Sequence, residues 1–225
     1  MTAAGDLTPV EHRLPVTRSA RVYTLGNLSA PEAWVVLHGY GQLAGRFARQ
    51  FTAIAGPQRA VVAPEALNKF YVDPPRPGGP PAAERKVGTT WMTREDRDAE
   101  ITDYVSYLDR VRAQMVPQAQ RVTALGFSQG VATACRWIAL GSVQVQRLIL
   151  WAGPVPNDLD LKRVAERTNG VSVEIVLGDR DEFAGYRNID VELAALRDAG
   201  VTYNMVRFDG GHVIDAATLS ALAKA

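Results

Sequence analysis

The amino-acid sequence predicts an α/β fold, a single domain built on a mostly parallel, twisted sheet with helices on both faces. A chain of 225 residues, 47% of them hydrophobic, is long enough to bury one sizeable core. Short apolar runs recur along it with few polar interruptions, as expected of parallel strands that are buried on both faces. Amphipathic segments separate these runs, and such alternation is typical of a parallel sheet whose crossover connections are helices.

Eight short runs are candidate strands. The runs in the middle of the chain are almost wholly apolar, whereas the first two alternate more and are compatible with an antiparallel hairpin at the edge of the sheet. The eight runs cover residues 12–18, 20–26, 33–39, 59–65, 121–127, 146–153, 171–178 and 202–208.

Five amphipathic segments between these runs are candidate helices. The clearest spans residues 94–115, where Ile101, Val105 and Leu108 share one apolar stripe at helical spacing. The five segments cover residues 46–55, 94–115, 129–140, 190–199 and 216–223. Their places between the strands favour helices that cover both faces of the sheet.

One segment, residues 72–88, breaks this alternation. Five of its residues are proline and three are glycine, too many for a helix or for the interior of a strand. We expect a surface loop here, or a flap beside an active site, because long structureless loops in compact domains are often functional. The segment is not a domain boundary, since the residues before it supply only part of the sheet.

Charge and composition exclude several classes of partner. Lys and Arg number 25 against 24 Asp and Glu, and a formal net charge of +1 gives no reason to expect binding to nucleic acid or to an anionic membrane. No apolar run approaches the ~18–20 residues of a membrane span, and the first residues lack the apolar core of a secretory signal. The single cysteine, Cys135, rules out an internal disulfide and fits a reducing compartment. We therefore expect a cytoplasmic protein without stable membrane insertion.

No group of residues indicates a metal centre. With one cysteine and scattered histidines, the chain has no ligand cluster at zinc-like spacing. Cys135 lies within the expected helix 129–140, and we interpret it as a packing residue and not as a nucleophile. We expect neither a metal nor a cofactor.

The motif GFSQG, residues 126–130, is the strongest sign of chemistry. Ser128 stands between two glycines where the apolar run 121–127 must reverse into the helix 129–140. Such a turn forces the serine into a strained backbone geometry that exposes its hydroxyl, and the helix N-terminus favours developing negative charge there. The motif in this context predicts that Ser128 is a nucleophile.

A serine nucleophile needs a base within hydrogen-bond distance, and the base needs an acid that fixes its tautomer. Of the three histidines, His212 is the best candidate because it follows the last strand, at the edge of the sheet where α/β folds place their sites. The acid should come directly after the preceding strand. Asp179, Asp181 and Glu182 are all available there, and each lies between the serine and the histidine in the chain.

Acyl transfer also needs two N–H donors for the oxyanion of the tetrahedral intermediate. The backbone N–H of Gln129, directly after the nucleophile, is one candidate. The stretch LHGYG after an early strand offers the other, because Gly39 and Gly41 let the backbone turn inward and leave the N–H of Tyr40 free.

Together, the stretches LHGYG, GFSQG, LGDRDEF and GGH resemble the α/β-hydrolase superfamily and, within it, the small carboxylesterase/acyl-protein thioesterase (phospholipase/carboxylesterase) family. The likeness runs from about Trp34 to the C-terminus and implies a fold without a large cap domain. The family's strand-end pattern Gly-x-x-Asp matches Gly178 and Asp181, which favours Asp181 over Asp179 as the acid. The family also carries a Trp after a long loop, which corresponds to Trp91.

The chain departs from the family's pattern at places that shape the pocket. After the acid it reads EFAGY where the family has a small apolar residue and a proline, and the loop before Trp91 is charged and rich in proline. The indole of Trp91 either lines a substrate pocket near Ser128 or belongs to the core and anchors the helix that follows.

These features predict a serine hydrolase that cleaves small-molecule carboxylic esters or thioesters through an acyl-enzyme, with Ser128, Asp181 and His212 as its catalytic residues. An acyltransferase or a peptidase-like hydrolase on the same fold is the nearest alternative. A non-catalytic binding protein with a degenerate pocket is an alternative of a different class.

Overall fold

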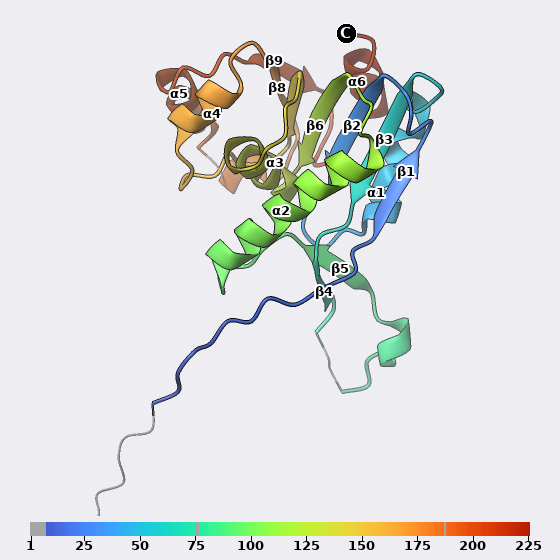
Figure 1. Ribbon diagram of the computed structural model, residues 1–225, viewed down its shortest axis with the longest axis vertical. Helices are drawn as coiled ribbons and strands as arrows, with labels where there is room; N and C mark the ends of the chain where they lie inside the picture. The colour runs from blue at the N-terminus through green and yellow to red at the C-terminus, as the bar shows by residue number, and fades with distance from the viewer. Residues whose placement is uncertain (1–7, 75–76, 187) are drawn as a thin grey trace, which may run out of the picture.

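The computed structural model describes residues 8–74, 77–186 and 188–225, and over these residues the chain forms a seven-stranded sheet and a separate two-stranded one (Figure 1). The order of the large sheet is β1-β3-β2-β6-β7-β8-β9, and every neighbouring pair is parallel except β1 with β3. Its strands are β1 (Val22–Leu25), β2 (Glu32–Leu37), β3 (Arg59–Pro64), β6 (Arg121–Phe127), β7 (Arg147–Trp151), β8 (Ser172–Gly178) and β9 (Asn204–Phe208). The predicted α/β fold with a mostly parallel sheet is confirmed.

Helices cover both faces of the large sheet (Figure 1). The α-helices are α1 (Ala44–Ala48), α2 (Arg97–Met115), α3 (Gln129–Leu140), α4 (Leu161–Arg167), α5 (Ile189–Asp198) and α6 (Ala216–Leu222). Buried side chains of α2, α3, α4 and α5 join the core on one face, whereas those of α1 and α6 join the core on the other. Within the described residues, none of the helices is both long enough and apolar enough to cross a membrane.

Strand β2 shows why the central runs are apolar throughout. Val35 and Leu37 belong to the core beneath α2–α5, while Trp34 and Val36 belong to the core beneath α1 and α6. All four are completely buried. A strand that is covered on both faces has no solvent side, so its sequence lacks the polar–apolar alternation of a half-exposed strand.

The expected hairpin at the N-terminal edge of the sheet is wrong. Residues 8–21 have no regular secondary structure, so no strand forms over residues 12–18. Leu14 is exposed there, and Pro15 lacks the N–H that a strand ladder would use. The edge strand β1 pairs antiparallel with β3 instead. The alternating pattern was therefore present without a partner strand to bury its apolar side.

Three helix assignments also need adjustment. The helix expected over residues 46–55 is α1 followed by the 3₁₀ helix η1 (Arg49–Ile54). The helix expected over residues 94–115 begins at Arg97, and the short helix α4 was not expected at all. By contrast, α3 has the bounds that were predicted for it.

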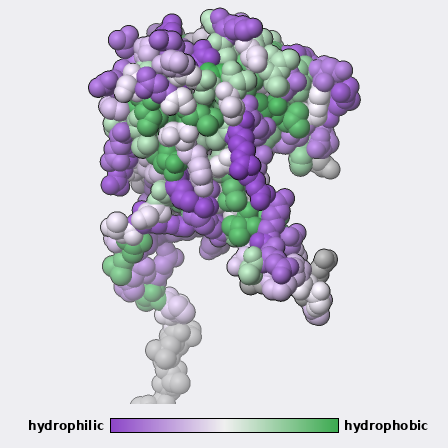
Figure 2. Space-filling model, turned by 90° about the vertical axis from the view of Figure 1, so that its right-hand side faces the viewer, coloured by the Kyte–Doolittle hydropathy of each residue, from purple (hydrophilic) through white to green (hydrophobic). Residues whose placement is uncertain are grey.

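The proline-rich segment, residues 72–88, leads from one short strand into another, and the sequence revealed neither strand. β4 (Asn68–Tyr71) and β5 (Val87–Thr90) pair as an antiparallel hairpin that projects below the sheet in Figure 1. The 3₁₀ helix η2 (Ala82–Glu84) lies within the segment, while residues 75–76 are outside the described residues. Figure 2 views the molecule from the right-hand side of Figure 1 and shows hydrophilic and hydrophobic residues interspersed on that face.

Strand β5 ties this hairpin to the turn that follows β2. The backbone N–H of Gly41 donates to Thr89 O (2.9 Å), and the N–H of Thr89 donates to Gln42 O (3.1 Å). The proline-rich segment is therefore held beside one of the predicted oxyanion loops.

The sheet reverses its winding direction between β2 and β6. β2 is followed in the chain by β3 on one side of it, and the next strand of the large sheet, β6, lies on its other side. Connections from adjacent strands that diverge in this way leave a crevice at the carboxyl ends of the strands, the usual site of ligand binding in open α/β sheets. The loops after β2, β6, β8 and β9 meet at this edge.

Candidate active site

Ser128 occupies a strained turn between β6 and α3. Its backbone angles are φ 55° and ψ −118°, and residues other than glycine seldom adopt a positive φ. The conformation is stabilised by the core around it, and the N–H of Ser128 donates to Trp151 O of the neighbouring strand at 2.9 Å. Such strain in a residue that bears a nucleophilic side chain is a feature of active sites.

The two glycines of the motif are required by the packing around the turn. A Cβ at Gly126 would lie 2.2 Å from Gly130 O, and a Cβ at Gly130 would lie 2.2 Å from Leu37 O. Both contacts involve backbone atoms that cannot move aside. Helix α3 therefore approaches the end of β2 as closely as it does because residue 130 has no side chain.

Asp181 and His212 form a hydrogen-bonded pair. The imidazole Nδ1 donates to Asp181 Oδ2 at 2.9 Å, and the backbone N–H of Phe183 donates to Asp181 Oδ1 at 2.9 Å. The side chains are 2% exposed for Asp181 and 15% exposed for His212. Both carboxylate oxygens are thus occupied, and the proton on Nδ1 leaves Nε2 as the nitrogen that can accept a proton.

Within the described residues, neither of the other two acids that the sequence offered forms a hydrogen bond with His212. The Asp179 carboxylate accepts a hydrogen bond from Arg207 Nε at 2.7 Å, and its side chain is 46% exposed. Glu182 is exposed as well. The geometry therefore favours Asp181, in agreement with the spacing that the family resemblance suggested.

Phe127 forms a contact between the nucleophile turn and His212. The ring of Phe127, the residue before Ser128, lies 4.9 Å from the His212 ring between centroids. Within the described residues, the Ser128 hydroxyl makes no hydrogen bond, to His212 or to any other group. Hydrogen bonds between a nucleophile and its base are often long without substrate and shorten when it binds.

The turn after β2 leaves one backbone donor unused. The N–H of Gly39 donates to Gln42 Oε1 (2.8 Å) and that of Gly41 to Thr89 O (2.9 Å). In the described part of the chain, the N–H groups of Tyr40 and Gln129 have no acceptor. The latter belongs to the first residue of α3, where no carbonyl of the helix can reach it. These are the two donors that the sequence predicted for an oxyanion.

His38 holds this turn as a neutral ring. Its Nδ1 donates to Gly39 O (2.8 Å), and its Nε2 accepts the backbone N–H of Ala66 (3.1 Å). The residue is fully buried, and burial lowers the pKa of His38 from 6.5 to about 4. An imidazole with this pKa stays uncharged at neutral pH and keeps one nitrogen as an acceptor.

The structure does not support Trp91 as a residue that lines an open substrate pocket. Its side chain is buried, with only 1% of the residue exposed. The indole Nε1 donates to His38 O at 2.9 Å, and its ring packs against His38 and Tyr104. Trp91 is a core residue, as one of the two sequence-based readings held, and it anchors the turn after β2.

The side chain of Gln129 has a role that the motif alone did not indicate. Its Oε1 accepts the backbone N–H of Trp91 (3.1 Å), and its Nε2 donates to Thr90 Oγ1 (2.8 Å) and Met92 O (3.1 Å). The residue therefore fastens the segment after β5 to the start of α3. Its acceptors include a backbone carbonyl, which carries no recognisable sequence signal.

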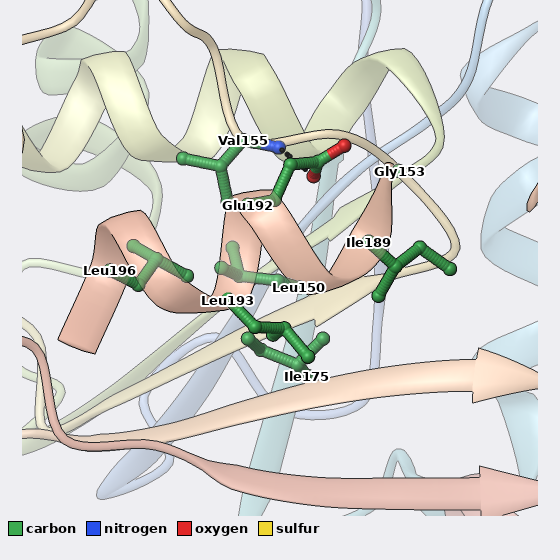
Figure 3. Close-up of a pocket in the computed structure, with 8 residues that line it drawn as sticks. All are labelled: Leu150, Gly153, Val155, Ile175, Ile189, Glu192, Leu193 and Leu196. Atoms are coloured by element: carbon green, nitrogen blue, oxygen red, sulfur yellow. Dashed lines mark hydrogen bonds between the residues drawn. The ribbon is translucent and has the colours of Figure 1, made fainter. Parts of the chain in front are cut away.

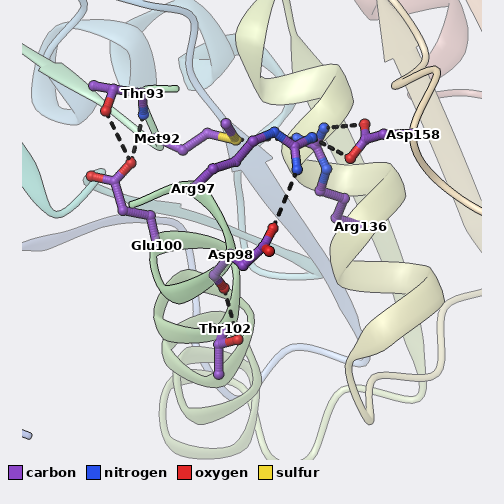
Figure 4. A network of polar contacts seen from close by, with 8 residues as sticks. All are labelled: Met92, Thr93, Arg97, Asp98, Glu100, Thr102, Arg136 and Asp158. Carbon is purple, nitrogen blue, oxygen red and sulfur yellow. Dashed lines mark hydrogen bonds and ion pairs between the residues drawn. The ribbon is translucent and has the colours of Figure 1, made fainter. Parts of the chain in front are cut away.

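A network of charged residues extends this connection along α3 (Figure 4). Arg136 is buried, and its Nη2 donates to Asp158 Oδ1 at 2.8 Å. Arg97 at the start of α2 pairs with the same carboxylate, and Arg136 Nη1 also contacts Met92 Sδ at 3.4 Å. The loop after β7 is thereby joined to both α2 and α3, a contact that sequence reasoning missed because its members are far apart in the chain.

A small apolar pocket lies between α5 and the strands β7 and β8 (Figure 3). It is lined by Leu150, Gly153, Val155, Ile175, Ile189, Glu192, Leu193 and Leu196. Gly153 also lies against the backbone of Ser128, so the pocket is next to the nucleophile turn. Trp91 takes no part in its lining.

Cys135 is buried in α3, and burial raises the pKa of its thiol to about 12. A thiol with this pKa is not ionised near neutral pH, and it is the thiolate that reacts. Cys135 therefore packs as an apolar side chain, as predicted.

The parallel sheet, the serine on a strained strand–helix turn and the Asp–His pair at the same edge define an α/β-hydrolase. Within that class, the sequence matches the Serine hydrolase (FSH1) family over residues 28–219, and the chain belongs to this family. It is thus an enzyme of the serine hydrolase type, as predicted. No curated protein matches the sequence.

Solved structures of esterases and thioesterases share the fold. Acyl-protein thioesterase 2 of Zea mays is 15% identical, with 92% of this chain and 97% of that chain covered and a TM-score of 0.70. A carboxylesterase of Mesorhizobium loti is 18% identical over 87% of this chain and 88% of its own, with a TM-score of 0.65. A phospholipase/carboxylesterase of Dyadobacter fermentans is 17% identical over 93% and 97%, with a TM-score of 0.61.

Proposed function

We propose that this serine hydrolase cleaves carboxylic esters or thioesters of small molecules through an acyl-enzyme on Ser128. The observation that carries the proposal is the Asp181–His212 hydrogen bond of 2.9 Å at the sheet edge that also bears the strained serine. A buried carboxylate on Nδ1 gives His212 the tautomer and orientation of a general base. The esterase and thioesterase names of the structural neighbours add support for the reaction class.

In the first step, Ser128 Oγ attacks the carbonyl carbon and its proton passes to His212 Nε2. The imidazolium that forms is stabilised by the Asp181 carboxylate, which stays ionised. The carbonyl oxygen becomes an oxyanion, and the free N–H groups of Tyr40 and Gln129 are the donors that would bind it. Preorganised donors of this kind typically contribute ~10²–10³ in rate each.

In the second step, the bond to the leaving oxygen or sulfur breaks and His212 Nε2 returns its proton to that atom. The acyl group remains on Ser128 Oγ as an ester. Water then attacks the acyl-enzyme with His212 again as the base, and the same sequence of proton transfers releases the carboxylic acid. Every group in this scheme belongs to the chain or to the substrates.

A cytoplasmic location is part of the proposal and is supported by the single, buried cysteine.

The test is Ser128→Ala, assayed with p-nitrophenyl acetate and with a fluorophosphonate probe that labels activated serines. We expect kcat to fall by ~10⁴–10⁶ and labelling to disappear, because the nucleophile is lost while the turn still accepts a small side chain. Ser142→Ala is the matched control, since Ser142 is exposed and hydrogen bonds to Asp109 beyond the far end of α3. Full labelling of Ser128→Ala would contradict the assignment.

A further inference from the structure

Phe183 is an aromatic side chain that the proposed chemistry does not use. It lies two residues after Asp181, in the stretch where the chain departs from the related family's pattern. Its ring is 4.6 Å from the His212 ring between centroids, and the residue is 52% exposed. Its backbone N–H donates to Asp181 Oδ1 at 2.9 Å, which fixes where the side chain begins. A half-exposed phenyl ring thus stands beside the proposed base, in a position to contact a ligand.

We expect the leaving group to lie near this ring. His212 Nδ1 is occupied by Asp181, so the proton for the leaving atom comes from Nε2. The leaving oxygen or sulfur therefore lies within hydrogen-bond distance of Nε2 in the second step. We expect the substituent that it carries to extend from the His212 ring toward the surface, where Phe183 is an exposed aromatic neighbour of His212.

The surroundings of His212 favour an apolar, uncharged substituent. Val213, the next residue, is 52% exposed, and its position is fixed because its carbonyl oxygen accepts Trp151 Nε1 at 2.9 Å. A carboxylate also lies against this loop, because Glu182 Oε2 is 3.5 Å from the position that a Cβ on Gly211 would take. A carboxylate there repels anionic leaving groups, while the two apolar side chains bury a neutral one.

We propose that Phe183 is a specificity-determining residue that selects esters of neutral, apolar and preferably aromatic alcohols. The proposal rests on the proposed function of Ser128 and His212. When the C–O bond breaks, the electron pair stays with the leaving oxygen, the His212 proton neutralises it, and the alcohol departs past Phe183. Contact between the aromatic ring of the alcohol and that of Phe183 lowers the energy of this passage, because aromatic pairs are favourable beyond the area that they bury.

The experiment compares kcat/KM for benzyl acetate and ethyl acetate, which share an acyl group and differ in the aromatic ring of an alkyl alcohol. We expect the wild-type enzyme to prefer benzyl acetate by roughly tenfold. Phe183→Ala should remove most of this preference, and Phe183→Leu should retain part of it as an apolar side chain without a ring. Leu140→Ala removes an exposed apolar side chain at the distant end of α3 and should keep the wild-type ratio.

Fluorophosphonate labelling of each variant shows whether the nucleophile and base are intact. An unchanged benzyl-to-ethyl ratio in Phe183→Ala would overturn the proposal. If kcat/KM fell equally for both esters, the ratio would also be unchanged, and Phe183 would only support the acid loop. Failure to turn over either ester despite labelling would overturn it too. The proposed function fails by a different result, which is turnover or labelling of Ser128→Ala.

Discussion

The candidate site has two sides: the oxyanion side, which is the turn after β2, and the base side, which is formed by the loops that carry Asp181 and His212. One buried indole hydrogen bond holds each side, and the remaining contacts differ. On the oxyanion side, the indole of Trp91 donates to His38 O, and on the base side the indole of Trp151 donates to Val213 O, each at 2.9 Å. The oxyanion side adds both nitrogens of the buried His38 ring and the backbone bonds to β5. The base side adds one carboxylate and the contacts of two aromatic rings with His212.

This difference predicts that mutations on the two sides will affect stability and catalytic rate differently. The oxyanion turn is fixed by several buried, uncharged hydrogen bonds, and each one that is broken leaves a buried polar group without a partner. The imidazole of His212, whose side chain is 15% exposed, is held by one hydrogen bond to a carboxylate. Loss of a hydrogen bond in the oxyanion turn should therefore lower both stability and rate, whereas a change at Asp181 that keeps its shape should lower the rate and leave stability almost unchanged.

The largest effect is expected for Asp181→Asn on the base side. The amide no longer fixes Nδ1 as the protonated nitrogen, so kcat should fall by ~10⁴ while the melting temperature changes little. Asp179→Asn is the matched control, because Asp179 follows the same strand and pairs with Arg207 at a half-exposed position. Steady-state kinetics with p-nitrophenyl acetate measures both. If Asp179→Asn proves the crippled variant, the roles of the two aspartates must be exchanged.

A smaller effect, on both rate and stability, is expected for Trp91→Phe on the oxyanion side. The phenyl ring keeps the packing but leaves His38 O without its donor, which should cost about 1–3 kcal/mol of unfolding free energy. A turn that is held less firmly should also lower kcat by ~10-fold. Urea denaturation and steady-state kinetics measure the two changes.

Trp137→Phe tests whether the loss of rate belongs to the site. Trp137 is fully buried and donates to Asp109 Oδ1 at 2.8 Å, so its variant loses a comparable hydrogen bond far from the oxyanion turn. It should lose stability while kcat stays at the wild-type value. Equal losses of kcat in the two tryptophan variants would remove the distinction between the two sides.

The last effect leaves the rate at neutral pH unchanged and is a dependence of stability on pH that comes from His38. Its pKa is about 4 in the folded chain against an ordinary value of 6.5, so the unfolded chain binds a proton more readily. The neutral His38 ring contributes about 3 kcal/mol to the free energy of unfolding above pH 6.5, and this contribution is lost as the pH falls toward 4. Proton NMR of the imidazole C–H signals should show no titration of His38 between pH 8 and 5. Titration of that signal near pH 6.5 would contradict its burial as a neutral ring.

The nucleophile turn was the part of the site most accessible to prediction. Ser128 lies between an apolar run and an Ala-rich amphipathic segment, and glycine, strand and helix patterns are all local in the sequence. Asp181 was less certain because Asp179 precedes it by two residues and both follow β8. The sequence pattern does not indicate which of the two carboxylates points toward His212, which lies 31 residues after Asp181.

Other features could not be predicted because their signals lie in partners or in backbone atoms. The acceptor of the Trp91 indole is a main-chain carbonyl, so nothing in the sequence distinguishes an anchoring tryptophan from one that lines a pocket. Strands β4 and β5 have four residues each, too few for a clear pattern beside a proline-rich stretch. The expected strand over residues 12–18 failed for the converse reason, because a pattern was present and a partner was not.

The position of β9 in the sheet bears on how the protein would lose activity. Among the described residues, β9 is an edge strand that pairs with β8 alone, and His212 follows it in the next loop. Ser128, by contrast, follows a strand with neighbours on both sides. Edge elements open at a lower free energy than central ones, since they break one ladder instead of two. Mild heat or denaturant would then detach the base while the nucleophile turn is still folded, and the enzyme would inactivate before it melts.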